Sequence, residues 1–396
     1  MKFLDVYLTF PDKDVVKIGE IAFTQRDNNK EPASAFRYTD EFLSHPRAFA
    51  IDPRNLPLKN QEHICERAPE DIHSVFEDSL PDAWGRRLLA KKYAIRIRQT
   101  NLAELLIYVG ANGMGALSYG GFSSTANQAR ITELKQLMKA AELFEKGEDI
   151  EQEYGLLFGA GSSPGGARPK ALVSDDETCY LAKFQSINDR YAMVPLEAAT
   201  LDLARQVGLS TPDWQVKKLG SQSVLLVKRF DVTEEGGRLH MISLKTLVGD
   251  QFYLKYQDLL NVIRRYSSQP QIDVPAFYRH LCFNALIGNT DDHVKNYSML
   301  HGNNGWFLSP AYDLLPNVGE NPEHALTFQS SAYPPSQNAL IKIGVDMFSM
   351  SKQKSAEMVQ QIVEVLSGWE NMFNNYDVPK QDIAKLKKDI NRRLLL

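Results

Sequence analysis

A short polar loop between residues 287 and 296 holds the side chains best suited to chemistry. Its sequence is Ile287-Gly288-Asn289-Thr290-Asp291-Asp292-His293-Val294-Lys295-Asn296. Asn296 follows Asp291 at a spacing of five, as in the catalytic loop of phosphoryl-transfer enzymes. There the Asp receives the proton of the substrate hydroxyl and the Asn holds Mg²⁺. Asn and Asp are also common turn formers, so the loop alone indicates a capping structure equally well, with His293 capping or stacking.

A second aspartate, Asp313, stands seventeen residues beyond Asn296 and interrupts an apolar, strand-like stretch. In a kinase-like site the β-hairpin after the catalytic loop brings up a second metal-binding Asp. Residues 302–305, Gly-Asn-Asn-Gly, followed by Trp306-Phe307-Leu308, predict that hairpin. A plain turn aspartate is the alternative.

A glycine-rich loop occupies residues 159–170 and includes Ser162-Ser163-Pro164-Gly165-Gly166-Ala167. It is followed by two short apolar runs, 171–173 and 179–184, which predict strands and place Lys183 on the second one. Exposed backbone N–H groups and one fixed cation are suited to nucleotide phosphates. The loop matches neither the Walker A pattern nor the dinucleotide fingerprint. A surface turn and an exposed strand lysine are the structural alternatives.

Three further features belong to this interpretation. Glu197, on the helix after Lys183, could pair with that lysine, or could be a first-turn residue favoured by the helix dipole. Residues 227–231, Val-Lys-Arg-Phe-Asp, end a small sheet where a kinase hinge would hold adenine, largely through its backbone. The basic side chains of the last helix predict a solvated face rather than a nucleic-acid contact: Lys385, Lys387, Lys388, Arg392 and Arg393.

The elements that must position these residues follow from hydrophobic periodicity. Residues 3–10 and 15–23 predict a hairpin around a polar turn. Apolar spacing predicts helices around Trp84 and Leu102, and a connector helix between 126 and 154. A helix over 195–207 should end at Gly208, before a β pair at 214–217 and 223–230. From about Met241 the pattern is mostly helical, through a tail helix over 382–396. We expect three parts: residues 1–125, 126–235 with the glycine loop, and an α-rich lobe over 236–396.

Composition narrows the class of protein. The chain has 396 residues, 43% of them hydrophobic, and a formal net charge of −4, which disfavours a nucleic-acid-coating surface. Three scattered cysteines provide neither a disulfide framework nor a Cys zinc site. No apolar run reaches the roughly 18–20 residues of a membrane span. We expect a cytoplasmic protein.

Together these segments resemble the HipA family of serine/threonine kinase toxins of type II toxin–antitoxin modules. The resemblance spans nearly the whole chain and rests on five motifs. These are residues 76–82 (FEDSLPD), 113–117 (GMGAL), 163–170 (SPGGARPK), 288–296 (GNTDDHVKN) and 311–315 (AYDLL). Some relatives have Gln and Glu in place of Arg168 and Pro169.

The resemblance implies roles for individual residues. Asp291 would be the catalytic base, Asn296 and Asp313 would bind Mg²⁺, and Lys183 would contact the ATP phosphates. Ser163, with Ser162 as the alternative, falls at the family's autophosphorylation serine, where a dianionic phosphate would displace the phosphates of ATP. The residues implied to contact ATP are Ser163, Gly165, Gly166, Ala167, Lys183, Lys228, Phe230, His293 and Lys295.

It also implies a fold and partners. We expect a bilobal α+β kinase-like fold with an additional N-terminal subdomain. The substrate would be a translation protein such as an aminoacyl-tRNA synthetase, and the partner a small helix-turn-helix, HipB-like antitoxin that mediates any DNA contact. Two alternatives stay open: a small-molecule kinase of the aminoglycoside phosphotransferase type, and a pseudokinase that serves only as a co-repressor.

Overall fold

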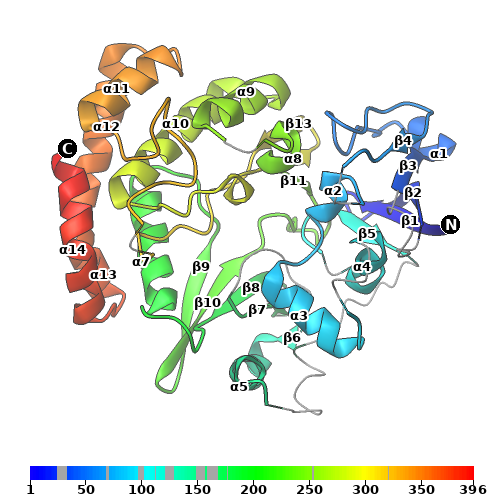
Figure 1. Cartoon of the computed structure of the whole chain (residues 1–396), viewed down its shortest axis with the longest axis horizontal. Helices are drawn as coiled ribbons and strands as arrows, with labels where there is room; N and C mark the ends of the chain where they lie inside the picture. The colour runs from blue at the N-terminus through cyan, green and yellow to red at the C-terminus, as the bar shows by residue number, and fades with distance from the viewer. Residues whose placement is uncertain are drawn as a thin grey trace. The chain divides into compact units, whose positions relative to one another are not determined.

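The computed structural model describes residues 1–24, 34–67, 71–96, 102–111, 113–120, 129–148, 157, 168–175, 177–251, 254–319 and 321–396 (Figure 1). Strands and helices both occur along these ranges, largely in separate runs, so the chain is a mixed α+β protein. It divides into two compact units. The N-terminal unit comprises Met1–Ile187, Lys228–Ile242 and Leu300–Asn303, and the C-terminal unit comprises Asn188–Val227, Ser243–Met299 and Asn304–Leu396.

A five-stranded sheet in the order β4-β3-β2-β1-β5 forms the first part of the N-terminal unit. Its strands are β1 (Lys2–Thr9), β2 (Val15–Phe23), β3 (Ser34–Tyr38), β4 (His63–Ile64) and β5 (Leu117–Tyr119). Leu4, Val6 and Leu8 alternate with less buried residues along β1, because successive side chains of a strand point to opposite faces. The expected hairpin is confirmed, since β1 pairs with β2 antiparallel.

Short helices accompany this sheet: α1 (Asp40–Leu43), α2 (Ser74–Glu77), α3 (Ala83–Lys92) and α4 (Leu102–Val109). The helices expected around Trp84 and Leu102 are therefore present. Trp84 is 1% exposed, and three residues of α4, Leu105, Leu106 and Val109, are at most 1% exposed. Their burial agrees with the apolar spacing that predicted the two helices.

The remaining elements of the N-terminal unit are β6 (Ala129–Arg130), η2 (Ile131–Glu133), α5 (Leu134–Lys146), β7 (Lys170–Ser174), β8 (Cys179–Phe184) and most of β11 (His240–Ser243). The two strands expected after the glycine loop are β7 and β8, which pair antiparallel with Lys170 opposite Lys183. The connector helix is α5, and it ends at Gly147 in the left-handed conformation that favours glycine.

The C-terminal unit is mostly helical. Its elements are α7 (Met193–Gln206), β9 (Trp214–Leu219), most of β10 (Gln222–Lys228), α8 (Leu244–Val248), α9 (Tyr256–Tyr266), α10 (Pro270–Ile287), η3 (Val294–Asn296), the start of β12 (Ser298–Gly302), β13 (Gly305–Leu308), α11 (Gln337–Asp346), α12 (Lys352–Leu366), α13 (Trp369–Asn375) and α14 (Lys380–Leu395). Figure 1 shows α10 beside α12 and α14, in agreement with their packing contacts. The buried residues of α10 include Phe277, Leu281 and Leu286, so this helix passes through the core of the unit.

Several expected boundaries differ from the structure. The helix expected from residue 195 begins two residues earlier at Met193, and the tail helix begins at Lys380. Met241 lies in β11, so the helical region begins at Leu244. The free cysteines Cys65, Cys179 and Cys282 agree with the absence of a disulfide framework.

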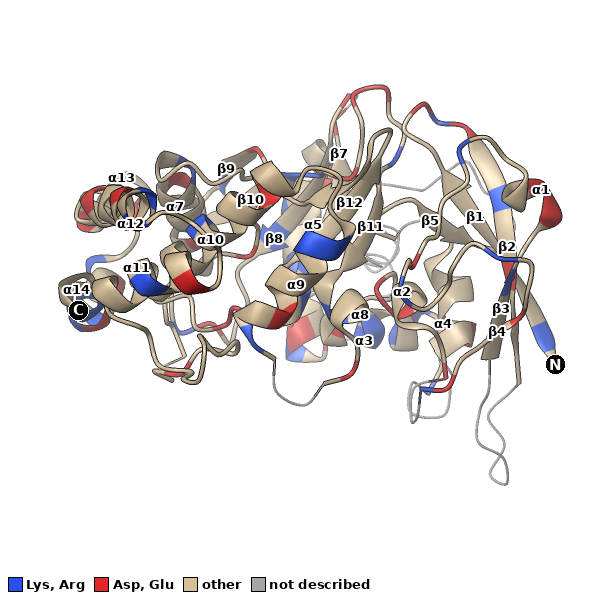
Figure 2. Ribbon diagram, turned by 90° about the horizontal axis from the view of Figure 1, so that it is seen from above, with Lys and Arg blue, Asp and Glu red and all other residues tan. Residues whose placement is uncertain are grey.

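Two properties concern the described part of the chain. Basic and acidic residues are interspersed along it, as the near balance of charge suggests (Figure 2). Among the helices that the structure describes, none is both long and apolar enough to cross a membrane.

Candidate functional site

The motif loop starts where α10 ends, and Gly288 makes that transition. Its φ of +83° is in the left-handed region, and its N–H donates to the Asn284 carbonyl at 3.1 Å, as in a C-cap. A Cβ at this position would lie 2.9 Å from Nε of Arg393. Gly288 is therefore required both by its backbone conformation and by the close approach of another side chain.

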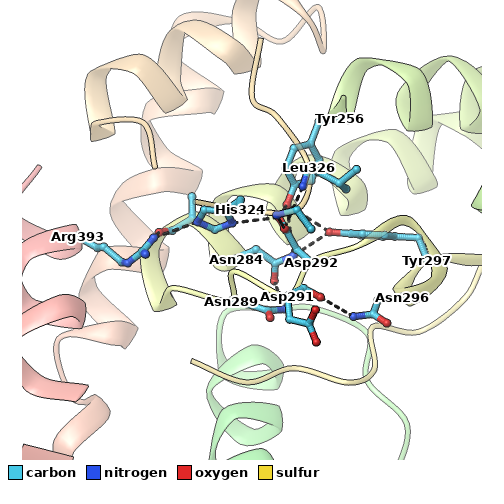
Figure 3. Close-up of polar contacts among 12 residues, drawn as sticks. Tyr256, Asn284, Asn289, Asp291, Asp292, Asn296, Tyr297, His324, Leu326 and Arg393 are labelled. Carbon is cyan, nitrogen blue, oxygen red and sulfur yellow. Dashed lines mark hydrogen bonds and ion pairs between the residues drawn. The ribbon is translucent and has the colours of Figure 1, made fainter. Parts of the chain in front are cut away.

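Asp291 and Asn296 are joined across the loop. The side-chain Nδ2 of Asn296 donates to the main-chain carbonyl of Asp291 at 2.9 Å, and its backbone N–H donates to the carbonyl of His293 at 2.8 Å (Figure 3). Asn296 is 8% exposed, whereas Asp291 is exposed. Because Nδ2 is engaged with the loop, Oδ1 is the Asn296 atom suited to a metal, and carboxamide and carboxylate oxygens are the ligands that Mg²⁺ prefers. Asp291 and Asn296 thus lie in one loop, and their catalytic and metal-binding roles stay a prediction.

Tyr312 connects this loop to the segment that contains Asp313. Its hydroxyl donates to the carbonyl of Lys295 at 3.0 Å and accepts from the Ser298 hydroxyl at 2.8 Å. The residue before Asp313 is thereby fixed to the residue before Asn296. The expected hairpin is present as β12 and β13, but the strand-like character expected around Asp313 is wrong: this residue lies outside any strand and has a φ of +57°.

Asp292, the second aspartate of the motif, has a buried structural position that the sequence did not reveal. It is 0% exposed, and Figure 3 shows its carboxylate directed away from that of Asp291. Oδ1 accepts from the backbone N–H groups of Ala325 at 3.0 Å and Leu326 at 3.3 Å. Oδ2 accepts from the Tyr256 hydroxyl and from Nδ1 of His324 at 3.1 Å. Burial and the negative charge of Asp292 raise the pKa of Tyr256, which keeps its hydroxyl a donor.

Arg393 shows that the solvated face expected for the tail helix is wrong at one position. Arg393 is 1% exposed, and its NH1 contacts both the carbonyl of Ala285 at 3.2 Å and Nε2 of His324 at 3.0 Å. Its Nε donates to Asp389 at 2.7 Å. A charged residue near the end of a helix is usually solvated. Here the contacts with α10 and with residue 324, which are remote in sequence, bury it.

The residues expected to contact ATP divide between the two units. Lys183 is half-buried on β8, opposite Lys170, which is 6% exposed. Lys228 ends β10 and is half-buried, as is Phe230. In the C-terminal unit, half-buried His293 precedes η3 and Lys295 is exposed within it. The glycine-loop residues lie outside the described part of the chain: Ser162, Ser163, Gly165, Gly166 and Ala167.

Glu197 lies further along its helix than expected. Because α7 begins at Met193, Glu197 belongs to the second turn rather than the first, and it is 7% exposed. The helix-dipole explanation for this carboxylate is therefore wrong, since the dipole effect is confined to the first turn.

A buried ion pair anchors the 113–117 motif in the N-terminal unit. Arg229 and Asp231 are fully buried, with Arg229 Nε 3.0 Å and NH2 2.5 Å from the two carboxylate oxygens. NH2 of Arg229 also donates to the carbonyl of Gly113 at 3.1 Å, and the N–H of Gly115 donates to Asp231 at 2.7 Å. Gly115 has a φ of +73°, and a Cβ added there would lie 3.0 Å from the backbone nitrogen of Met241. Residues 227–231, which the sequence predicts to be a hinge, thus hold the turn at Gly115 in place.

Comparisons with known proteins agree on one family. Residues 162–369 match the family model described as "HipA-like C-terminal domain", and residues 14–120 match "HipA N-terminal domain". The two models together cover most of the chain. The C-terminal match alone covers more than half of it and includes Lys183, Asp291, Asn296 and Asp313.

Curated relatives align over shorter stretches. "Putative kinase Y4dM" of Sinorhizobium fredii is 34% identical over 150 residues, which are 33% of this chain and 36% of the relative. "Putative kinase Y4mE" of the same organism is 29% identical over 31% of this chain and 32% of its own length. "Toxin YjjJ" of Escherichia coli is 27% identical over 40% and 39%. The aligned part is thus about a third of the length of each relative.

A solved structure matches over almost the entire length. It is described as the Shewanella oneidensis MR-1 toxin–antitoxin system HipA, HipB and its operator DNA complex. The match covers 98% of this chain and 96% of that chain, with a TM-score of 0.68 and 16% sequence identity. At that identity the likeness concerns the fold.

Proposed function

Because the chain belongs to the HipA family, we propose that it is an ATP-dependent serine/threonine protein kinase, the toxin of a type II toxin–antitoxin module. The observation that carries this proposal is the loop of Asp291 and Asn296, held by the bond between the Asn296 amide and the Asp291 carbonyl. This loop lies within the part of the chain that matches the HipA-like C-terminal domain. The expected bilobal kinase-like arrangement, with lobes at 126–235 and 236–396 after a 1–125 subdomain, belongs to the same proposal.

The catalytic roles follow from the chemistry of the side chains. Asp291 accepts the proton of the substrate hydroxyl as the hydroxyl oxygen bonds to the γ-phosphorus and the bond to the β-phosphate oxygen breaks. Oδ1 of Asn296 and the Asp313 carboxylate would hold Mg²⁺, whose charge neutralises the phosphate oxygens. Lys183 contributes a fixed positive charge toward the phosphates, with Glu197 as its positioning partner. Lys228, Phe230, His293 and Lys295 complete the proposed ATP contacts.

We assign regulation to the glycine loop. Autophosphorylation of Ser163, with Ser162 as the alternative, would add roughly two negative charges to a loop that otherwise binds phosphates. Gly165, Gly166 and Ala167 would supply the backbone N–H groups of that loop. A phosphate there opposes ATP binding by charge repulsion, so the modified protein is the inactive form.

The partners belong to the same proposal. The antitoxin would be a small HipB-like helix-turn-helix protein, as the description of the Shewanella complex suggests. DNA contact would occur through that partner, consistent with the net charge of −4 of this chain. The substrate would be a translation component such as an aminoacyl-tRNA synthetase, encountered in the cytoplasm.

The test compares the mass and phosphosites of wild type, Asp291→Ala and Asn296→Ala after incubation with ATP and Mg²⁺. Asn303→Ala, in the exposed turn between β12 and β13, is the matched control. We expect phosphate on Ser163 or Ser162 in wild type and in the control, and none in the two loop variants. Phosphate on Asp291→Ala at the wild-type level would contradict the catalytic assignment.

Two further outcomes separate the alternatives. Phosphate transfer to an aminoglycoside-type small molecule, without any phosphoprotein product, would indicate a small-molecule kinase. ATP binding without any transfer in the wild type would indicate a pseudokinase that serves as a co-repressor. A phosphorylated aminoacyl-tRNA synthetase identified by mass spectrometry would support the proposed substrate class.

A further inference from the structure

The residues on both sides of Asp291 are fixed to one short segment, residues 324–326: Thr290 through its backbone carbonyl and Asp292 through its carboxylate. The N–H of Ala325 donates to the carbonyl of Thr290 at 3.0 Å and to Oδ1 of Asp292 at 3.0 Å. The N–H of Leu326 donates to the same carboxylate oxygen at 3.3 Å. Asp291 therefore lies between two residues that are bound to the same anchor, residues 324–326. A displacement of this anchor would displace the Asp291 carboxylate.

His324, the first residue of this anchor, connects Asp292 to the C-terminal helix. Its Nε2 lies 3.0 Å from NH1 of Arg393, which can only donate, so Nε2 accepts and Nδ1 carries the proton donated to Asp292. Figure 3 shows the three side chains in a row. The ring also packs edge-on against Phe328, with centroids 5.0 Å apart. Arg393 thus fixes both the tautomer and the orientation of the ring that holds Asp292.

Arg393 differs in this respect from its neighbour on α14. Both Arg392 and Arg393 contact Asp389, at 2.7 Å in each case. The Arg392 side chain is 47% exposed, whereas that of Arg393 is 0% exposed and also contacts Ala285 and His324. The two arginines are therefore a matched pair: they have the same charge, helix and carboxylate partner, and one of them reaches the catalytic loop.

We infer that Arg393 and His324 are positioning residues for phosphoryl transfer, acting through Asp292 on the backbone of Asp291. This inference rests on the proposed kinase function. Removal of the hydrogen-bond partner that orients a metal ligand typically costs about 10- to 100-fold in activity, and we expect a loss of this size for the loop that carries Asp291 and Asn296. A buried chain of three hydrogen-bonded groups is suited to this role because each member restricts the orientation of the next.

The kinetic experiment measures kcat and the KM for ATP of wild type, Arg393→Met and Arg392→Met. We expect Arg393→Met to lower kcat by about 10- to 100-fold while the KM for ATP changes by less than about threefold. Arg392→Met should keep kcat within about twofold of wild type, because a substitution at an exposed ion pair usually has a small effect. Wild-type kcat in a folded Arg393→Met protein would overturn the inference.

Variants at His324 test its two hydrogen bonds separately, the one to Asp292 and the one to Arg393. His324→Asn places an amide nitrogen near the position of Nδ1 and keeps a donor for Asp292, but has no acceptor that reaches Arg393. His324→Leu loses both bonds. We expect kcat to decrease in the order wild type, His324→Asn, His324→Leu. Equal kcat for all three proteins would contradict the positioning role of His324. If Arg393→Met does not fold, Arg393→Lys and His324→Asn provide the same comparison.

Hydrogen exchange gives a readout that does not depend on catalysis. Arg393→Met should accelerate amide exchange in the peptide covering residues 284–297, and Arg392→Met should not. If wild type transfers no phosphate, the proposed function fails, but faster exchange in this peptide would still support the positioning of the loop. Unchanged exchange in Arg393→Met would overturn the positioning even in an active kinase.

Discussion

Adjacent aspartates in the motif loop should respond in opposite ways to the same isosteric change. Asp292→Asn keeps the shape of a side chain whose oxygens accept from Tyr256, His324, Ala325 and Leu326. The new NH2 group must replace one of these two oxygens, and both oxygens face donors. The best orientation of the amide directs NH2 toward Tyr256 and His324, since the two backbone N–H groups cannot reorient.

The size of the effect follows from those two donors. The Tyr256 hydroxyl can rotate, but His324 cannot change its tautomer because its Nε2 accepts from Arg393. A hydrogen bond to a charged group contributes about 1.5–3 kcal/mol, so the lost bond from His324 and the weaker, neutral bond to Tyr256 together cost about 3–4 kcal/mol. Removal of a buried charge relieves its desolvation and offsets part of this cost. We expect the free energy of unfolding to fall by about 3 kcal/mol.

Asp291→Asn is the matched control, because its carboxylate is exposed. It should change the free energy of unfolding by less than about 0.5 kcal/mol, as is usual for a surface site, yet abolish phosphoryl transfer. Urea-induced unfolding measures stability, and intact mass after incubation with ATP and Mg²⁺ measures transfer. An Asp292→Asn protein as stable as wild type, or an Asp291→Asn protein that is the less stable of the two, would refute the reasoning.

Three further stability measurements, all by urea-induced unfolding, test other parts of the structure. Asp231→Asn should lower the free energy of unfolding by about 3–5 kcal/mol, because it leaves a fully buried guanidinium without its carboxylate. Asp213→Asn, in an exposed pair, should lower it by about 1 kcal/mol or less. Equal losses in the two variants would contradict this. Gly288→Ala should lower the free energy of unfolding by about 2 kcal/mol, because residue 288 has a positive φ and a Cβ there would contact the Arg393 side chain. The loss should exceed that of Gly147→Ala, since Gly147 has a φ of +74° but a Cβ there would have no atom within 4 Å. Burial lowers the pKa of His280 to about 3, so the folded state binds fewer protons than the unfolded state and loses stability as pH falls below about 6.5. His280→Leu should remove about 1.4 kcal/mol of the loss between about pH 7.5 and 5.5, and an unchanged pH dependence would show that this ring does not titrate on unfolding.

The local elements of the fold could be predicted from the sequence. The β1–β2 hairpin, the β7 and β8 strands, and the helices around Trp84 and Leu102 all follow from hydrophobic periodicity and turn residues. That Asp291 and Asn296 belong to one polar loop also follows from the sequence, whereas the bond from the Asn296 amide to the Asp291 carbonyl is seen only in the structure. The boundaries differ by a few residues from those expected, as at Met193, because helix ends are the least sharply defined part of an element.

Long-range contacts decided the rest. Adjacent aspartates are equivalent in the sequence, but Asp292 is buried by His324, 32 residues away, and that histidine is fixed by Arg393, a further 69 residues along the chain. Arg392 and Arg393 likewise belong to one basic stretch, and only the packing of α14 against α10 buries one of them. The types and spacing of the residues therefore determine which groups can do chemistry. The tertiary structure determines which of two identical neighbours faces the substrate and which holds the loop, because burial is set by segments that are distant in sequence.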